Sequence, residues 1–257
     1  MAWGTVPNRV KQLYQAGKCA YGTYIMMPSP ASVEIAALSG FDFVRIDGYH
    51  TQMNPETLQA MVTTAHSYDI TPWMRCRNDP IEIELMLGMG VQIVTIPNLH
   101  NAQLARAAVD AIRYPPKGNR EASGVHRFAG GGRDYAEENI LLSCQIESRE
   151  GLENYKDIIR TEGMDCIQAG RGDIALALGL EGEFHPKVLE WEDRIFTTAM
   201  DAGKMVSFVH PFTDDGIERT LRWIERGMRV PTMDHDRRVM QRGFTMGLQR
   251  LRESAKA

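Results

Sequence analysis

The chain has 257 residues, 43% hydrophobic and 24% charged, and its 29 Lys and Arg residues against 33 Asp and Glu residues give a formal net charge of −4. This composition is typical of a globular protein and gives no electrostatic footprint for nucleic acid. No apolar run approaches the roughly 18 residues of a membrane helix, and the first residues lack the apolar segment of a signal peptide. The four cysteines form no CxxC pair and lie in apolar segments, so we expect reduced, mostly buried thiols in a cytoplasmic protein.

Short apolar runs alternate along the chain with longer segments of helical period. Eight runs are strand candidates: residues 19–28, 41–50, 71–77, 91–97, 141–148, 165–173, 204–210 and 229–236. Helix starts between them are marked by a cap residue and a proline at Ser29-Pro30, Asn54-Pro55 and Asp79-Pro80. Eight such units average about 32 residues each, the size of a repeat in a (β/α)8 barrel. The sequence predicts a single α/β domain over residues 1–257, a TIM barrel, with an open doubly wound sheet as the alternative.

One connection, residues 114–139, is longer than a barrel repeat needs. It contains two prolines and the glycine triplet 130–132. Loops of this length in compact domains are usually functional or mobile. The triplet could bind phosphate, but it does not follow a strand and open a helix as a P-loop does, so we favour a lid or an interface loop.

Polar side chains stand where the predicted strands end. In a barrel the catalytic groups come from these carboxyl ends, so we expect the side chains to converge on one mouth. They are Asp47, His50, Arg75, Gln145, Glu147, Arg171, Asp173, His210, Asp234, His235 and Asp236.

Two of these residues, Glu147 and Asp173, are one βα unit apart, which places two carboxylates on adjacent strands at the same level. Unpaired carboxylates would repel each other, and a hard divalent cation such as Mg²⁺ or Mn²⁺ would remove that cost. The alternative is that they pair with Arg75, Arg149 or Arg171, and the spacing alone does not decide between the two. No cluster of cysteine and histidine suggests zinc.

His50 and Arg75 are the candidates for proton transfer and charge stabilisation. A histidine at the mouth can act as a general base near neutral pH. Arg75 lies on an otherwise apolar strand and can offer forked donors to a carboxylate or an enolate oxygen. No lysine ends a strand at the mouth, since Lys204 opens a strand at the opposite end, which argues against Schiff-base chemistry.

Five motifs, in order and at comparable spacing, carry a family resemblance. They are GFDFVRIDGYH (40–50), Arg75 followed by Asn78-Asp79-Pro80, RYPPKGNR (113–120), QIESREG (145–151) and AGRGDIALALG (169–179). Together they resemble the HpcH/HpaI family of metal-dependent pyruvate aldolases, class II enzymes of the phosphoenolpyruvate/pyruvate barrel superfamily.

The resemblance implies a role for each matching residue. Glu147 and Asp173 would be ligands of a divalent metal, either Mg²⁺, Mn²⁺ or Co²⁺. Gln145, the backbone around Gly172, and Asp173 would hold the 2-oxo acid, Arg75 would stabilise its enolate, and His50 would act through water as the base. The resemblance also implies a homohexamer in which a C-terminal helix, here within residues 237–251, is exchanged between neighbours.

Several positions depart from the family pattern. The family's acidic residue before the histidine is Tyr49, its proline after the strand-6 glycine is Arg171, its serine of DLS is Ala175, and its RG pair in the long loop is Arg120-Glu121. The acidic residue that supports the histidine aligns with Gly88. A missing carboxylate would leave His50 less basic and less firmly oriented.

The leading interpretation is a lyase that reversibly cleaves a 4-hydroxy-2-oxo acid to pyruvate and an aldehyde. A related ketoacid C–C lyase or decarboxylase, suggested by Tyr49 and Gly88, and a metal–ketoacid binding protein without turnover remain alternatives. An acyl-CoA lyase is a weaker alternative, because no binding site for the adenine or diphosphate of coenzyme A is seen in the sequence. Basic residues near the mouth or on the long loop suggest an acidic or polyhydroxylated aldehyde, unless they are simply solvated: Arg77, His126, Arg127 and Arg171.

Overall fold

The fold was obtained as a computed structural model, which describes residues 6–121 and 132–255. Within them nine short strands form one parallel sheet in the order β7-β6-β5-β4-β3-β2-β1-β9-β8. Each strand lies inside one of the eight segments predicted to be strands. They are β1 (Gly22–Ile25), β2 (Phe43–Asp47), β3 (Thr71–Arg75), β4 (Ile93–Ile96), β5 (Leu141–Ile146), β6 (Cys166–Ala169), β7 (Met205–Val206), β8 (Val209–His210) and β9 (Thr232–His235).

The sheet closes through residues 205–210, predicted as one strand and divided in the structure into β7 and β8. β7 pairs with β6, whereas β8 pairs with β9. Between them the N–H of Ser207 donates to the Ile167 carbonyl at 3.1 Å, and the N–H of Thr232 donates to the Phe208 carbonyl at 3.0 Å. One segment therefore joins both edges, and the predicted (β/α)8 barrel is confirmed over the open sheet.

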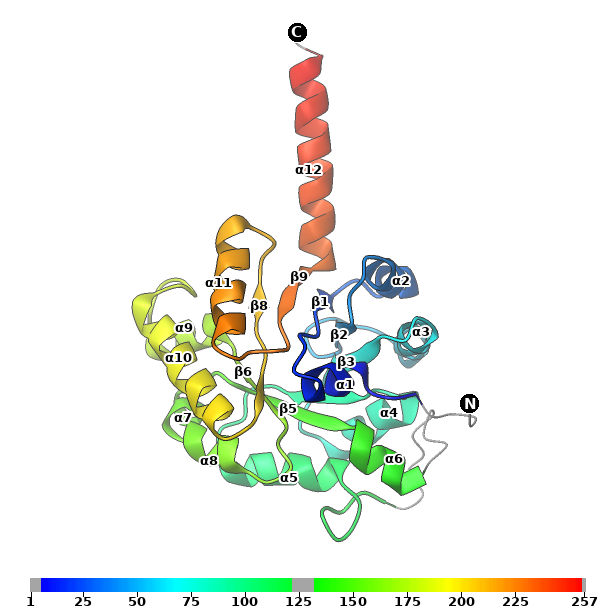
Figure 1. Ribbon diagram of the computed structural model, residues 1–257, viewed down its shortest axis with the longest axis vertical. Coiled ribbons are helices and arrows are strands. Elements are labelled where there is room, and N and C mark those ends of the chain that lie inside the picture. The colour runs from blue at the N-terminus through cyan, green and yellow to red at the C-terminus, as the bar shows by residue number, and fades with distance from the viewer. Residues whose placement is uncertain (1–5, 122–131, 256–257) are drawn as a thin grey trace.

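Helices surround the strands on the outside of the barrel (Figure 1). Where the sequence predicted a cap and a proline, a helix begins at the proline, as in α2, α3 and α4. The described helices are α1 (Arg9–Gln15), α2 (Pro30–Leu38), α3 (Pro55–Ser67), α4 (Pro80–Met89), α5 (Ala102–Ile112), α6 (Gly132–Asn139), α7 (Arg149–Glu153), α8 (Tyr155–Arg160), α9 (Arg171–Leu178), α10 (Pro186–Asp201), α11 (Asp214–Glu225) and α12 (Asp236–Ser254).

The amino-terminal end of the barrel is closed by α1, which the sequence analysis did not predict. Val10 of α1 is fully buried among side chains from the starts of the strands, including Phe43, Trp73 and Ile93. The main core lies between the strands and the surrounding helices. The carboxyl ends of the strands are left as the open end of the barrel.

The connection between α5 and β5 contains a helix, α6, where a long loop was predicted. Gly132 opens this helix with a positive φ of 63°. The other two glycines of the triplet, and the basic residues His126 and Arg127, lie outside the described residues. The predicted lid or interface loop therefore stays a prediction.

The four cysteines are free thiols, as predicted. Cys76, Cys144 and Cys166 are buried, and Cys19 is partly exposed. Burial raises the pKa of the Cys166 thiol to about 12, and it also raises the pKa values of Cys76 and Cys144. These thiols are therefore protonated at neutral pH and suited to packing rather than to chemistry.

The C-terminal helix α12 extends away from the barrel (Figure 1). No residue of α12 is buried. Its first residue, Asp236, ties it to β1 by accepting hydrogen bonds from the N–H groups of Met26 at 2.9 Å and Met27 at 3.0 Å. Among the helices of the described ranges, α12 included, none combines the length and the apolar composition that crossing a membrane requires.

Candidate active site

A cavity of about 500 Å³ lies at the carboxyl ends of the strands. It brings together Glu147, Asp173 and His50, three residues that the sequence predicted to share one site. The full lining consists of Tyr49, His50, Asn98, Glu147, Ser148, Arg149, Asp173 and Ala177. Gln145 and Arg75 stand beside it, since Gln145 bonds to both Glu147 and Arg75.

Glu147 follows the last residue of β5 and is 5% exposed. Its Oε1 accepts a hydrogen bond from the N–H of Asn98 at 3.1 Å, and its Oε2 accepts one from Nε2 of Gln145 at 3.1 Å. Burial, followed by the negative charge of Asp173, raises the pKa of Glu147 to about 7. The folded protein thus holds a carboxylate whose charge is poorly compensated.

Asp173 is exposed and lies in the first turn of α9, which directly follows β6. The residue before α9, Gly170, gives no side-chain cap to the helix. The first-turn N–H groups of a helix have no intrahelical acceptors and favour anions. The backbone around Gly172 therefore offers donors beside the Asp173 carboxylate, in keeping with a carboxylate-binding role.

Neither carboxylate forms an ion pair with a lysine or arginine of the described residues. The alternative partners have other contacts: Arg75 pairs with Asp47, Arg171 pairs with Glu192, and Arg149 donates to the Ala177 carbonyl. Two oxygen-bearing side chains without a cation fit a hard divalent ion that keeps water or substrate in its other positions. In the described part of the chain, no three His, Cys, Asp or Glu side chains gather as a larger metal site.

Arg75 is held in one orientation by Asp47 and Gln145. Its Nη2 donates to Oδ2 of Asp47 at 2.7 Å, its Nε to Oδ1 at 3.2 Å, and its Nη1 to Oε1 of Gln145 at 3.1 Å. Burial alone would raise the pKa of Asp47, but hydrogen bonds from Arg75 and from the N–H groups of His50 and Tyr49 outweigh it and hold that pKa low. Three of the five guanidinium N–H donors are used, so two remain for a ligand.

His50 is exposed at the wall of the cavity. Its N–H donates to Oδ1 of Asp47 at 3.1 Å, and its ring packs edge-on against Tyr49 with centroids 4.8 Å apart. Asp47 therefore fixes both the turn that carries His50 and the guanidinium of Arg75. From the sequence, Asp47 was predicted only as one of many strand-end residues, with no role of its own.

Other strand-end residues do not line this cavity. His210 is buried, and its Nε2 accepts a hydrogen bond from Nη1 of Arg171 at 2.6 Å. Burial and the charge of Arg171 lower the pKa of His210 to about 2, so it is a poor base. Asp234 accepts from the N–H of Phe212 at 3.0 Å, and Asp236 anchors α12. For these residues the expected convergence on one mouth is wrong.

The comparisons with known proteins agree with this geometry. The model of the family described as HpcH/HpaI aldolase/citrate lyase matches residues 20–231. The chain belongs to this family. A pyruvate aldolase of Rhizobium etli is 37% identical over 189 residues, 71% of this chain and 74% of the relative. A 5-keto-4-deoxy-D-glucarate aldolase of Escherichia fergusonii is 34% identical over 257 residues, 97% of each chain.

A solved structure, that of the citrate synthase SbnG, superposes with a TM-score of 0.88 at 26% identity and covers 97% of this chain and 99% of its own. This likeness shows that the two proteins share the same fold over almost their whole length. The predicted family is confirmed, and with it the prediction of an aldolase, a carbon–carbon lyase that works on a 2-oxo acid.

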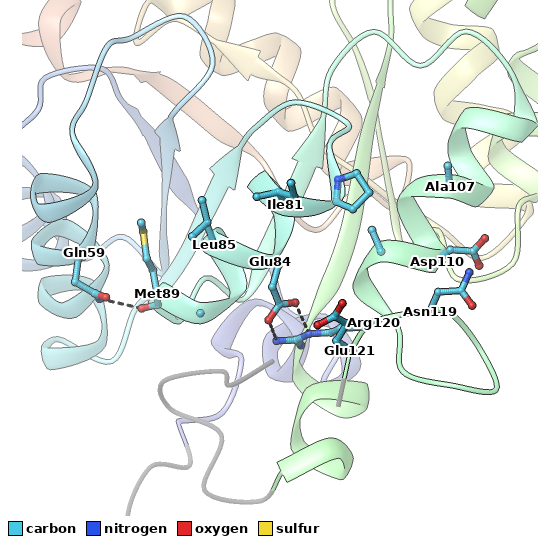
Figure 2. Close-up of a pocket in the computed structure, with 13 residues that line it drawn as sticks. Gln59, Ile81, Glu84, Leu85, Met89, Ala107, Asp110, Asn119, Arg120 and Glu121 are labelled. Atoms are coloured by element: carbon cyan, nitrogen blue, oxygen red, sulfur yellow. Dashed lines mark hydrogen bonds and ion pairs between the residues drawn. The ribbon is translucent and has the colours of Figure 1, made fainter. Parts of the chain in front are cut away.

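Gly88, where the HpcH/HpaI pattern has an acidic residue, lies in the last turn of α4. Since α4 runs back from β3 to the start of β4, this turn is at the opposite end of the barrel from His50. Gly88 lines a larger groove of about 920 Å³, in which Glu84 pairs with Arg120 and Gln59 bonds to Met89 (Figure 2). A carboxylate at position 88 is therefore too distant to support His50 of the same chain.

Three residues of this candidate site were not predicted from the sequence. Asn98 follows β4 and donates to Glu147, and Ser148 lines the cavity. Both stand at strand ends, so the rule that found the other residues would also have found them. Gly170 gives space to Glu147, because a Cβ at this position would stand 1.9 Å from Oε2. No sequence pattern reveals such a contact between two strands.

Proposed function

We propose that the chain cleaves a 4-hydroxy-2-oxo acid to pyruvate and an aldehyde, reversibly, with a divalent cation held by Glu147 and Asp173. The observation that carries the proposal is the pair of carboxylates, which form no ion pair with a Lys or Arg in residues 6–121 and 132–255 and lie in one cavity with His50, beside a firmly held arginine. A divalent ion at this pair would supply positive charge next to the keto oxygen of the substrate. Mg²⁺, Mn²⁺ and Co²⁺ all suit such oxygen ligands.

Binding of the 2-oxo acid follows from the backbone at the start of α9. The substrate carboxylate would accept hydrogen bonds from the free N–H groups around Gly172, next to Asp173. Gln145 holds Glu147 through its Nε2 and Arg75 through its Oε1, and it thereby fixes the distance between the carboxylate pair and the guanidinium. The keto end of the substrate would lie between these groups.

Cleavage requires removal of the proton from the 4-hydroxyl group. His50, at the exposed side of the cavity, would take this proton through a water molecule as the C3–C4 bond breaks. The aldehyde leaves with the former hydroxyl oxygen as its carbonyl, and the bonding electrons become the enolate of pyruvate. Returning a proton to C3 completes the formation of pyruvate.

Arg75 would stabilise the enolate oxygen. Its guanidinium is bonded to Asp47 and Gln145 before substrate arrives, so its two free donors require no rearrangement. Donors fixed in advance near a developing charge contribute about 10² to 10³ in rate. Asp47 acts on Arg75 and on the turn of His50, so one carboxylate orients both groups.

The substrate we propose is a diacid. The relative from Escherichia fergusonii is a 5-keto-4-deoxy-D-glucarate aldolase. Numbered from its keto end, that compound is a 4-hydroxy-2-oxo diacid, and its cleavage yields pyruvate and a three-carbon acidic aldehyde. In this chain Arg149 lines the cavity without an ion-pair partner among the described side chains, and it could receive the second carboxylate.

The test is pyruvate release by chelator-treated protein, with and without added Mg²⁺, Mn²⁺ or Co²⁺. The panel consists of 5-keto-4-deoxy-D-glucarate, a matched 4-hydroxy-2-oxo monoacid and oxaloacetate. Metal-dependent release from the hydroxy acids, with the diacid preferred, is the expected result. Release from oxaloacetate alone would identify a decarboxylase, and metal binding without turnover would identify a binding protein.

We also propose that the chain is a homo-oligomer, a hexamer by family resemblance, in which α12 packs on a neighbouring subunit. In a closed barrel the helix after the eighth strand covers it, between the helices that follow the strands on either side. Here α12 leaves that place, and large exposed side chains stand on both flanking helices, Ile35 and Leu38 on α2 and Ile217 and Leu221 on α11.

Along α12 itself, apolar side chains at helical spacing are also exposed: Met240, Phe244, Leu248 and Leu251. Light scattering on the full chain and on a chain that ends at residue 235 would test the exchange. We expect the shortened chain to form smaller assemblies. A cytoplasmic location and the single-domain organisation stay predictions from the sequence.

A further inference from the structure

The side chain of Arg171, two residues before the predicted metal ligand Asp173, is not part of the cavity lining. It is 5% exposed and contacts three other parts of the chain. Its Nη1 donates to Oε1 of Glu192 on α10 at 3.3 Å, its Nη2 donates to the carbonyl of Val209 on β8 at 3.0 Å, and its guanidinium stacks over Phe184 at 4.8 Å from the ring centroid. The first residue of α9 is thus bonded to two other elements of the barrel.

A directed chain of hydrogen bonds continues from Arg171 into α11. Nη1 of Arg171 is a donor only, so Nε2 of His210, 2.6 Å away, must be the acceptor. The proton of the neutral imidazole therefore sits on Nδ1, which donates to Oγ1 of Thr220 at 3.0 Å. The hydroxyl of Thr220 in turn donates to the carbonyl of Gly216 at 2.8 Å. The donor at Arg171 and the acceptor at Nε2 of His210 are thereby fixed, while the Thr220 hydroxyl also lies 3.4 Å from Sδ of Met233.

At position 171 this chain has a charged residue where the family pattern has a rigid one. The HpcH/HpaI pattern has proline where this chain has Arg171, and proline fixes its own φ at the first position of a helix. A buried arginine is costly unless it is paired and hydrogen-bonded. Here Glu192, 4% exposed, supplies the charge, and His210 and Val209 supply acceptors.

We propose that Arg171, together with Glu192 and His210, is a positioning residue that fixes the first turn of α9. That turn carries Asp173 and the N–H groups around Gly172. The proposal rests on the proposed function in taking Asp173 as a metal ligand and these N–H groups as the carboxylate site. Arg171 itself touches neither the cation nor the substrate.

A purely structural arginine provides the matched control. Arg113 is equally buried, with 8% of its side chain exposed, and it donates to the Ile140 carbonyl and to Oδ2 of Asp165, both at 2.9 Å. These partners precede β5 and β6, at the end of the barrel away from the cavity. Loss of Arg113 should therefore cost stability without moving the site.

The experiment compares Arg171→Lys, Glu192→Gln and Arg113→Lys with the wild type. Four quantities are measured: the dissociation constant of Mn²⁺ without substrate, kcat and KM for the 2-oxo acid, and the rate of amide hydrogen exchange of residues 174–178 in metal-free protein. Changes to groups that orient metal ligands typically cost about 10- to 100-fold in metal affinity. We expect losses in this range for Arg171→Lys, a larger rise in KM than fall in kcat, and faster exchange in α9.

Glu192→Gln should show the same pattern more weakly, and it provides the test should Arg171→Lys fail to fold. Arg113→Lys should lower the melting temperature and change none of the four quantities. Unchanged Mn²⁺ affinity and α9 exchange in both Arg171→Lys and Glu192→Gln would overturn the proposal, as would equal effects from Arg113→Lys. A wild type that neither binds Mn²⁺ nor releases pyruvate would refute the proposed function instead, and the exchange data would still decide whether Arg171 fixes α9.

Discussion

Gly170, the last residue before α9, lies directly against the carboxylate of Glu147. A Cβ at position 170 would stand 1.9 Å from Oε2 of Glu147 and 3.0 Å from its Cδ. The two residues follow neighbouring strands, β6 and β5. Glycine is thus required here by a close approach and not by backbone conformation, since its φ is −83°.

Gly170→Ala should therefore displace the Glu147 carboxylate. We expect Mn²⁺ affinity to fall by about tenfold or more, as for other losses of ligand orientation. Gly172→Ala is the matched comparison, because a Cβ there meets nothing within 4 Å, and it should bind Mn²⁺ like the wild type. Calorimetric titration of both variants checks the prediction. Equal affinities in the two would mean that Glu147 has room to move.

The sequence was sufficient for the barrel and for the residues at its strand ends. Apolar runs, caps and prolines are local signals, and they located eight segments that contain all nine strands, with β7 and β8 predicted as one, as well as the starts of α2, α3 and α4. Strand order in a barrel follows chain order, so the spacing of Glu147 and Asp173 correctly assigned them to neighbouring βα units. The prediction that Asp173 lies on a strand is wrong, because β6 ends at Ala169 and Asp173 lies in the first turn of α9. The same reasoning missed Asn98 only because it was not applied to the end of β4.

The partners and orientations of the site side chains could not be predicted, because they depend on contacts between segments that are distant in the sequence. Arg75 could have paired with Glu147, and only the structure shows that Asp47 and Gln145 take its donors. His210 ends a strand, as predicted, but its side chain is enclosed between β8 and α11 rather than facing the cavity. The packing of helix side chains determines which way a strand-end side chain faces, and residue spacing along the chain does not predict that packing.

Glu147→Gln should stabilise the metal-free protein in a pH-dependent way. The pKa of Glu147 is about 7 in the folded state, above the ordinary value of 4.5, so folding favours the protonated form. The wild type therefore loses stability as pH rises from about 4.5 to 7, by about 3 kcal/mol at most, and a neutral glutamine does not. Melting curves with a chelator present should show the difference between variant and wild type growing through this window and constant above it. A difference that does not change with pH would contradict the raised pKa.

Asp173→Ala should abolish metal binding and leave the melting temperature of the metal-free protein nearly unchanged. Asp173 is exposed and contributes nothing to the core, so its removal deletes a ligand without opening a cavity. Glu147→Ala should also abolish binding. Calorimetry with Mn²⁺ beside a melting curve measures both effects. Wild-type affinity in either variant would remove that residue from the metal site.

Arg75→Lys should lower kcat much more than it raises KM. An ammonium group can bond to Asp47 or face the substrate, but it cannot reproduce the forked contact with Asp47 and the bond to Gln145 while keeping free donors. If the arginine acts mainly as enolate charge develops, the loss in kcat should be about 10² or more. Steady-state kinetics of pyruvate release decide the matter. Near-normal kcat with a lowered melting temperature would make Arg75 a structural partner of Asp47 instead.

His50→Ala addresses the proton transfer. If His50 is the base, the rate of the wild type should fall toward acidic pH as the imidazole becomes protonated, and the variant should lose that limb along with about 10² to 10⁴ of its rate. Asp47→Asn is the informative companion, because Asp47 holds the N–H of His50 at 3.1 Å and the Arg75 guanidinium at 2.7 Å. The asparagine can keep one contact to each but loses the negative charge. It should therefore depress kcat while retaining the acidic limb.

The pH profile separates the possible roles more sharply than the rate does. A variant lacking His50 that keeps the same acidic limb and most of the rate would place proton transfer elsewhere. Tyr49, which packs against His50 and lines the same cavity, would then be the residue to change. His210 is not a candidate for the base. Its Nε2 accepts a hydrogen bond from Arg171, its side chain is buried, and its pKa of about 2 keeps it neutral across the working pH range. The outcome with His50→Ala thus distinguishes a histidine-driven cleavage from one in which a tyrosine or a water molecule alone accepts the proton.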